Sequence, residues 1–208
     1  MRFHTSLALL AVLAVPVAAM ATPVPLIVKG TGIGAVGTLD PNWTLVSAPA
    51  GATTNTAIIS DANAVWFQPH GQFHWINPSG SGNTAEPVGV YDYTNTFNIG
   101  SGFNASTAIL NLHIAADDSV DVYLNGGLQF SYAAPAWPAT TFFTINNGFV
   151  QGNNTLEFVV DNSGGGPTGA YAEISGSIEP IPEPSTLMLL GTGIVGLAGA
   201  ARRKLFRA

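Results

Sequence analysis

The sequence predicts an all-β fold in which two sheets pack face to face as a β-sandwich. Between residues 22 and 179, no long segment shows the 3.6-residue spacing of apolar side chains that an amphipathic helix requires. Short runs rich in Val, Ile, Thr, Phe and Tyr occur instead, and Gly, Asn and Pro interrupt them. Apolar and polar residues alternate within these runs, which indicates strands with one buried face. About eight or nine such strands are typical of a sandwich.

Taken in chain order, the first strands are short and the later ones show the clearest alternation. Strands are predicted over residues 26–28, 43–46, 57–59, 90–99 and 142–145. Four further segments place apolar side chains on one face: Leu110, Leu112 and Ile114; Val120, Val122 and Leu124; Leu156, Phe158 and Val160; Ala172, Ile174 and Ile178. Asn125-Gly126 follows the second of these segments and predicts a type I′ hairpin turn.

Residues 1–21 predict a secretory signal peptide. Arg2 gives a short basic start, and an apolar run over residues 7–17 follows it. Ala19-Met20-Ala21 then fits the small-x-small pattern that signal peptidase cleaves. We therefore expect a mature chain that begins at Thr22 and a domain over residues 22–180. The alternative, a retained membrane anchor, requires a longer apolar run.

The last segment, residues 181–208, predicts a transmembrane helix with a basic tail. Residues 186–201 carry no charge and as a helix extend roughly 24 Å, a short membrane span. A basic tail over residues 202–207 follows and begins with Arg202, Arg203 and Lys204. The positive-inside rule keeps such a tail in the cytoplasm. The helix is therefore expected to hold the exported body at the inner membrane before processing.

A Pro-Glu-Pro tripeptide, Pro182, Glu183 and Pro184, stands just before that helix. Its prolines keep the backbone extended, the form in which a protease binds a substrate. With the following Ser-Thr-Leu, the glycine-rich apolar run and the arginines, it resembles the PEP-CTERM sorting signal of Gram-negative bacteria. The resemblance implies processing by an exosortase and delivery to the cell surface or extracellular matrix, in association with exopolysaccharide and biofilm. A plain anchor behind a chance Pro-Glu-Pro is the alternative.

The body carries a second resemblance, over roughly residues 75–178. Ala116-Asp117-Asp118, the strand that leads into Asn125-Gly126, and residues 154–160 occur in an order similar to that of the galactose-binding-like domain. This family includes many carbohydrate-binding modules. The resemblance implies that the sandwich is a jelly roll.

The charge distribution excludes one class of partner. Eleven carboxylates lie between Asp40 and Glu179, and Lys29 is the only lysine or arginine between Arg2 and Arg202. A body with a net charge of about −10 repels nucleic acid, so no nucleic-acid role is expected. The chain has no cysteine, which excludes disulfides and thiolate chemistry.

Asp117, Asp118 and Asp121 form the densest acidic group. Three interpretations remain open: a solvated turn, a calcium site, and catalytic carboxylates. Calcium is compatible with oxygen ligands, and the galactose-binding-like resemblance implies that a structural calcium is common. Catalysis requires an apolar setting that raises one pKa, which the neighbouring sequence does not predict.

Aromatic residues supply the candidate ligand contacts. Trp66 and Trp75 occur in a stretch that alternates aromatic side chains with amides and with His74, and Trp137 stands between two prolines. Sugar rings stack on aromatic faces while amides bind hydroxyl groups, so these four residues are candidate polysaccharide contacts. The alternative is that the tryptophans belong to the apolar core.

No pairing of a nucleophile with a base is recognisable, and the sequence predicts a protein that is not an enzyme. The leading hypothesis is an exported, exosortase-processed surface or matrix protein that binds exopolysaccharide. The alternatives are a purely structural or adhesive matrix protein and an enzyme acting on polysaccharide.

Overall fold

The structure is a computed structural model of the chain, and it describes residues 21–182 and 184–205. Its strands all fall within one compact unit, Thr22–Ile181, which we call the body. The helix α1 (Pro184–Leu205) lies outside this unit and is described separately. The expected signal peptide, apart from Ala21, and Glu183 of the tripeptide lie outside the described residues.

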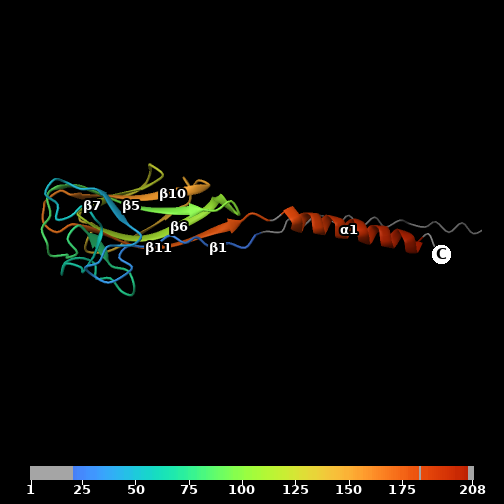
Figure 1. Cartoon of the computed structure of the whole chain (residues 1–208), viewed down its shortest axis with the longest axis horizontal. Coiled ribbons are helices and arrows are strands. Elements are labelled where there is room, and N and C mark those ends of the chain that lie inside the picture. Colours follow the sequence, from blue (N-terminus) through green and yellow to red (C-terminus); the bar gives the residue numbers. More distant parts are fainter. Residues whose placement is uncertain (1–20, 183, 206–208) are drawn as a thin grey trace, which may run out of the picture. The chain divides into compact units, whose positions relative to one another are not determined.

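The body is a sandwich of two antiparallel sheets, as the sequence predicts (Figure 1). The first sheet has the strand order β3-β4-β11-β6-β9, with β1 also beside β11. Its strands are β1 (Val24–Pro25), β3 (Ile58–Ser60), β4 (Trp75–Asn77), β6 (Phe103–Asp117), β9 (Thr141–Ile145) and β11 (Gly169–Pro180). The second sheet has the order β2-β5-β10-β7-β8. Its strands are β2 (Thr44–Ser47), β5 (Gly89–Ile99), β7 (Ser119–Leu124), β8 (Gly127–Tyr132) and β10 (Gly152–Asn162).

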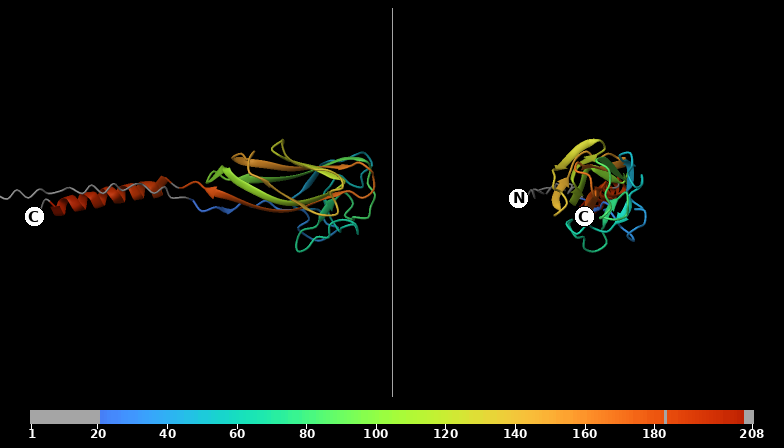
Figure 2. Two further views of the ribbon diagram at one scale, coloured as in Figure 1. Left: turned by 180° about the vertical axis from the view of Figure 1, so that it is seen from behind. Right: turned by 90° about the vertical axis from the view of Figure 1, so that its left-hand side faces the viewer.

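The core lies between the two layers, which Figure 2 shows from behind and end-on. The predicted inward faces of β6, β7 and β10 are confirmed, because the nine apolar side chains assigned to them are all buried. The two-residue turn is confirmed as well. Leu124 pairs with Gly127, and Asn125 and Gly126 both have the positive φ angles of a type I′ turn.

Two strands were not predicted, and one predicted strand is displaced. Strand β4 has three buried residues in a row, so it lacks the alternation that identifies a strand. Strand β8 is an edge strand without a fully buried side chain. The strand predicted over residues 26–28 instead forms at β1, which begins two residues earlier and pairs with Ile178 and Ser177 of β11.

The prediction of a transmembrane helix is wrong. A helix does form, α1, but none in the described part of the chain is long and apolar enough to cross a membrane. The uncharged residues 186–201 extend only roughly 24 Å, less than the hydrocarbon core of about 30 Å. Their four glycines also dilute the apolar side chains.

Candidate functional site

A second apolar cluster covers part of the outer face of the first sheet. Ala115 of β6 and Tyr171 of β11 are cross-strand neighbours on that face. Trp66 and Trp75 pack on them, and the centroids of the two indole rings lie 4.3 Å apart. We call this group, with the half-buried Phe67, Phe73, Ala62 and Trp137, the outer cluster.

The structure brings the three predicted tryptophans together but packs them as core residues. Trp66 is 3% exposed and Trp75 is 0% exposed, so neither presents a ring face to a sugar. The Trp75 indole N–H donates to the Phe67 carbonyl at 3.0 Å. Trp137 is half-buried, and its carbonyl accepts from the Phe67 N–H at 2.6 Å. The interpretation as apolar core therefore describes Trp66 and Trp75.

His74 is not part of a ligand-facing group. Its ring is half-buried, and Nδ1 lies 3.0 Å from the carbonyl oxygen of Gly32. The Thr31 hydroxyl donates to the His74 carbonyl at 2.9 Å. His74 therefore joins the segment before β4 to the loop that follows the N-terminal segment.

Asp117 ends β6 beneath the outer cluster. Its Oδ2 accepts from the Trp66 indole N–H at 2.8 Å, and its side chain and backbone together are only 8% exposed. Burial, reinforced by a hydrogen bond and charge from Asp118, raises the pKa of Asp117 to about 7. The carboxyl group is therefore half-protonated near neutral pH.

Asp118 holds the loop that follows β10. Its Oδ2 accepts from the Ser163 N–H at 2.8 Å, the Ser163 hydroxyl at 2.9 Å and the Gly164 N–H at 3.1 Å. Burial alone would raise the pKa of Asp118, but hydrogen bonds from Asp117, Gly164 and Ser163 outweigh it and lower the pKa. The pKa values of the two adjacent carboxyls are therefore shifted in opposite directions, up for Asp117 and down for Asp118.

The three aspartates do not assemble into one site. Asp121 lies on the outer face of the second sheet, where its neighbours across the strands are Val159 and Ser131. Within residues 21–182 and 184–205, no three His, Asp or Glu side chains come close enough to hold a metal ion. Asp117 and Asp118 are also engaged by N–H donors, so the three side chains do not fit a calcium ion as they stand.

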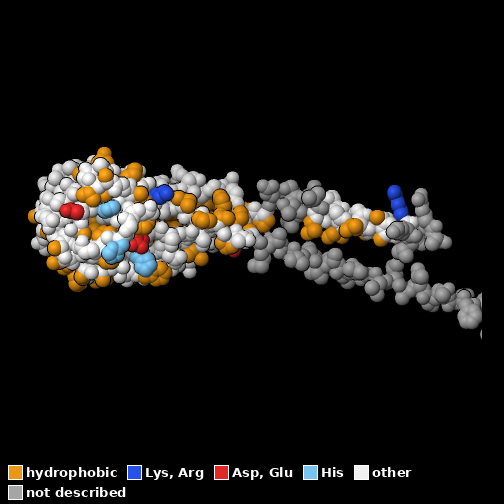
Figure 3. Space-filling view, turned by 90° about the horizontal axis from the view of Figure 1, so that it is seen from below, with side chains coloured by type: hydrophobic (Ala, Val, Ile, Leu, Met, Phe, Trp, Pro, Cys, Tyr) orange, Lys and Arg blue, Asp and Glu red, His pale blue; other side chains and the backbone are white. Residues whose placement is uncertain are grey.

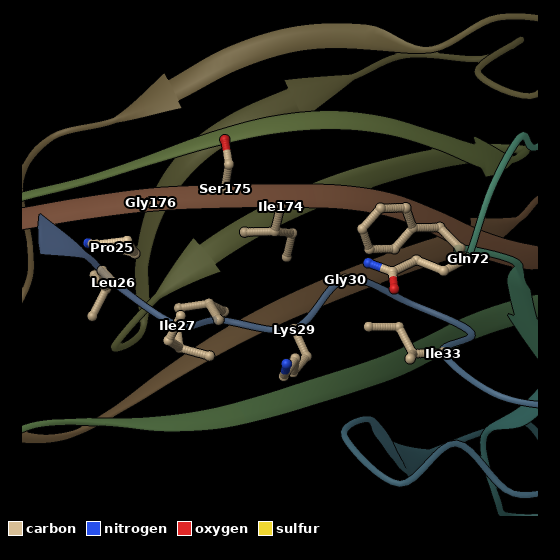
Figure 4. A pocket seen from close by; sticks show the side chains of 12 residues that line it. Pro25, Leu26, Ile27, Lys29, Gly30, Ile33, Gln72, Ile174, Ser175 and Gly176 are labelled. Carbon is tan, nitrogen blue, oxygen red and sulfur yellow. The ribbon is translucent and has the colours of Figure 1, made fainter.

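One edge of the sandwich has pockets that the sequence does not predict. Three adjoining cavities, of about 300, 270 and 250 Å³, flank residues 25–30 and have Ile27 as a common wall. We call them the edge pockets. The largest is also walled by Lys29, Gln72, Phe73 and Ile174 (Figure 4).

The edge pockets arise because the N-terminal segment leaves β11 and rejoins it. The Leu26 N–H donates to the Gly176 carbonyl at 3.0 Å, and the Thr31 N–H donates to the Ala172 carbonyl at 2.9 Å. Between these two bonds the segment departs from the strand. On its other side, the Lys29 carbonyl accepts from the Trp43 indole at 3.1 Å and from the Asn95 amide at 3.3 Å. The segment therefore bridges the two sheets along an open edge.

Neutral polar groups line the second of these cavities. Its walls include Asn42, Asn95, Thr96 and Asn98, together with Lys29, Pro41, Phe97 and Ile27. Ile27 is 65% exposed although it lies between two buried neighbours, Leu26 and Val28. Amides that can bind hydroxyl groups thus lie beside exposed apolar carbon, a combination suited to a sugar ring.

The burial of residues 26–28 marks this site, but the sequence does not show it because all three residues are apolar. Residues 26–28 alternate buried, exposed and buried, and the exposed Ile27 and Lys29 follow one another on the outward side. A short apolar run predicts a strand, but it cannot show that the chain leaves the neighbouring strand. The pocket depends on that departure, so it was not predictable from the local pattern.

Comparison with protein families finds one match, at the C-terminus. Residues 180–204 match the family described as the PEP-CTERM protein-sorting motif. The chain carries a PEP-CTERM motif. The motif indicates export and a surface or matrix location, with processing by an exosortase. A comparison with curated protein sequences finds no match.

The described part of the PEP-CTERM motif is largely exposed. Pro182 is exposed, and Pro184 begins α1, the helix position where proline is best tolerated. Arg202 and Arg203 are exposed in the last turn of α1. The side chain of Lys204 is outside the described residues.

The body is similar to several solved carbohydrate-binding modules at low identity. One is a family 35 module from Clostridium thermocellum, with 16% identity, a TM-score of 0.31, and coverage of 58% of this chain and 86% of the module. Another is TmCBM61, solved with β-1,4-galactotriose, with 14% identity, a TM-score of 0.41, and coverage of 69% and 92%. A third is CBM35 from Paenibacillus barcinonensis, with 15% identity, a TM-score of 0.31, and coverage of 73% and 98%.

Proposed function

We propose that this exported protein binds polysaccharide at the edge pockets of its body, without catalysis. The observation that carries the proposal is the continuity of the site. Ile27 walls all three cavities, Lys29 walls two of them, and Asn98 joins the second to the third. The PEP-CTERM motif supports the same function, since it indicates delivery to the surface or matrix, where extracellular polysaccharide lies.

The dimensions of the site favour a chain over a small compact ligand. Each cavity is at or just below the lower end of the range of about 300–1,000 Å³ in which ligands are usually buried. Together they follow residues 25–30, which in extended form cover roughly 17–20 Å. A linear polysaccharide can occupy adjoining shallow cavities at once, whereas a monosaccharide can fill only one.

The chemistry of the lining suits hydroxyl-rich ligands. The side chains of Gln72 and Asn98 are exposed at the walls, and an amide can donate and accept at once. The Asn98 amide also donates to Asn153 Oδ1 at 2.8 Å, which leaves its oxygen and its second N–H for a ligand. A neutral hydrogen bond contributes only about 0.5–1.5 kcal/mol net. Affinity per sugar unit is therefore modest, and useful binding depends on several units bound along the edge.

The acidic pair supports a protein without catalysis. A glycosidase holds its two carboxyls about 5–10 Å apart, with the sugar between them. Asp117 and Asp118 are instead adjacent in the chain, and their hydrogen bonds hold Trp66 and the loop at residues 163–164. Their separated pKa values are explained by this structural role.

Titration of the full-length chain with a panel of soluble polysaccharides tests the proposal. A double variant, Gln72→Ala with Asn98→Ala, should weaken binding by about tenfold, as expected for two lost hydrogen bonds. Phe142→Ala is the matched control, because this ring is 55% exposed on β9 and lies outside the edge pockets. Loss of binding in the control, with none in the double variant, would move the site to the outer face of the first sheet.

The second candidate function is a structural or adhesive matrix protein. The burial of Trp66 and Trp75 favours it, because the tryptophans most suited to stacking on sugars stabilise the fold instead. The same titration separates the two candidates. An absence of saturable binding to every polysaccharide in the panel would reject the edge pockets as a sugar site and leave the structural function.

A further inference from the structure

Lys29 is the single positive charge that the fold places in the edge pockets. It is the only lysine or arginine between residues 22 and 182, and it lines both the first and the second cavity. Among the described residues, no carboxylate lines any of the three cavities. Basic side chains are sparse on the face of the body in Figure 3.

The Lys29 ammonium is available, and its backbone is fixed. Its side chain is exposed, and no hydrogen bond or ion pair of the ammonium is found within the described residues. Its carbonyl accepts from both Trp43 and Asn95, so the residue is anchored to β5 and to the start of β2. Figure 4 shows the side chain directed away from β11.

The nearest carboxylate in the sequence, that of Asp40, is hydrogen-bonded to backbone N–H groups. Asp40 precedes Pro41 and Asn42 of the second cavity, but it is buried. Its Oδ1 accepts from the N–H groups of Asn42 and Trp43, and its Oδ2 accepts from the Gly32 N–H at 2.6 Å. Asp40 therefore has backbone partners in place of Lys29, and the ammonium remains free to bind a ligand.

We infer that the edge pockets select an anionic polysaccharide, one of whose carboxylate or sulfate groups binds the Lys29 ammonium. This inference rests on the proposed function and specifies its ligand class. Neighbouring hydroxyl groups of the polymer bind the amides of Gln72 and Asn98, and Ile27 contacts the sugar ring. An ammonium is a compact charge with three donors, so it binds either kind of anion.

The acidic body does not prevent this binding at physiological salt. Beyond about 8 Å, charges in 0.15 M salt are largely screened. A ligand anion at Lys29 therefore responds mainly to groups in the pockets, none of which is a carboxylate among the described residues. A polymer elsewhere on the surface meets the carboxylates of the outer faces and is repelled, which restricts binding to this edge.

Two matched pairs of polysaccharides test the inference on the full-length chain. Polygalacturonate is compared with its fully methyl-esterified form, and a sulfated galactan with its desulfated form, so that charge is the variable within each pair. We expect at least tenfold tighter binding to one charged polymer than to its neutral form in 0.15 M salt. The pair that shows the preference identifies the anion as carboxylate or sulfate.

Three variants assign the preference to Lys29. Lys29→Gln should abolish the preference, so that the charged and the neutral polymer bind with equal affinity, and Lys29→Arg should retain it. Asn147→Asp lowers the net charge by the same one unit on an exposed loop beyond β9, outside the edge pockets, and should leave the preference intact.

The outcomes separate this inference from the function on which it rests. Equal binding of charged and neutral polymers by the wild type, or a preference that survives in Lys29→Gln, overturns the anionic specificity alone. No binding of any polymer overturns the proposed function as well.

Discussion

The indole N–H of Trp66 donates to Oδ2 of Asp117 at 2.8 Å. This bond joins the segment before β4 to the end of β6, so it ties the outer cluster to a strand of the first sheet. Both groups are buried, and a buried donor or acceptor without a hydrogen bond destabilises the fold. The bond removes this cost for both groups. Trp66, which composition marks as a candidate ligand contact, and Asp117, which it marks as a candidate metal ligand, therefore hold the outer cluster on the first sheet.

The raised pKa of Asp117 predicts a stability that falls as pH rises. Its pKa is about 7 in the folded protein and 3.8 when the chain is unfolded. Between these two values the folded state therefore binds a proton that the unfolded chain has released. The stabilisation is full below pH 3.8 and is lost as pH rises through about 7, at no more than about 1.4 kcal/mol per pH unit. The free energy of unfolding, measured in urea from pH 4.5 to 8.5, should decline and then level off.

Asp117→Asn isolates this contribution, because an amide can accept from Trp66 and donate to Asp118 without titrating. The decline should become shallower in the variant, and at pH 8 the variant should be at least as stable as the wild type. Asp92 also has a raised pKa, caused by burial, so a residual slope of the same sign is expected. An unchanged slope in Asp117→Asn would contradict the assignment, and Asp121→Asn serves as the control.

Asp118 predicts a local effect on the loop after β10. Asp118→Ala removes the acceptor of three hydrogen bonds from Ser163 and Gly164. Hydrogen bonds to a charged group contribute about 1.5–3 kcal/mol each at most and are not additive, so we expect a loss of about 2–3 kcal/mol in the free energy of unfolding. Amide exchange at residues 163 and 164 should accelerate. Ser163→Ala, which removes one of the three bonds, should cost less than half as much.

Chelation should leave the stability unchanged. A calcium ion at the aspartates would have to displace the N–H donors of Trp66, Ser163 and Gly164, and Asp121 lies on a different face. The melting temperature of the full-length chain in EDTA and in 1–5 mM Ca²⁺, roughly the range that weak extracellular calcium sites require, should agree within error. A melting temperature that rises in calcium in the wild type, but not in Asp118→Asn, would show that a metal binds there.

The sorting motif predicts that processing of the protein depends on Glu183. Replacement Glu183→Ala should leave a full-length, unprocessed form in the producing cell, because Pro-Glu-Pro is the distinctive element of the motif matched at residues 180–204. The readout is the mass of the protein in the cell and in the medium. Glu179→Ala, which removes a carboxylate at the end of β11 just before the motif, is the control and should be processed normally.

The longer strands were predictable because each of them has one buried face. Strands β6, β7 and β10 alternate along their central residues, and that alternation reports burial directly. Strand β4 could not be found this way, because the outer cluster buries Trp75 on the face that a sandwich normally exposes. The outer cluster depends on a loop that returns over the sheet, which a local pattern does not encode.

The candidate site was less predictable than the fold. Composition correctly drew attention to Trp66, Trp75 and Asp117, which the structure brings together, but it could not distinguish an exposed aromatic surface from a packed one. The membrane helix was predicted from the absence of charge and the roughly 24 Å length of residues 186–201, but the described helix is not long and apolar enough for a span. The sequence identifies Lys29 as the only basic residue of the body, but it does not place that residue in a pocket.

Hydrogen–deuterium exchange of the full-length chain, with and without a saturating polysaccharide ligand, tests the central claim most directly. The edge-pocket account predicts slower exchange over residues 26–30, 72–73 and 95–98, and unchanged exchange over β9 and residues 161–168. Protection confined to β9 or to residues 161–168, with none over residues 26–30, would contradict it.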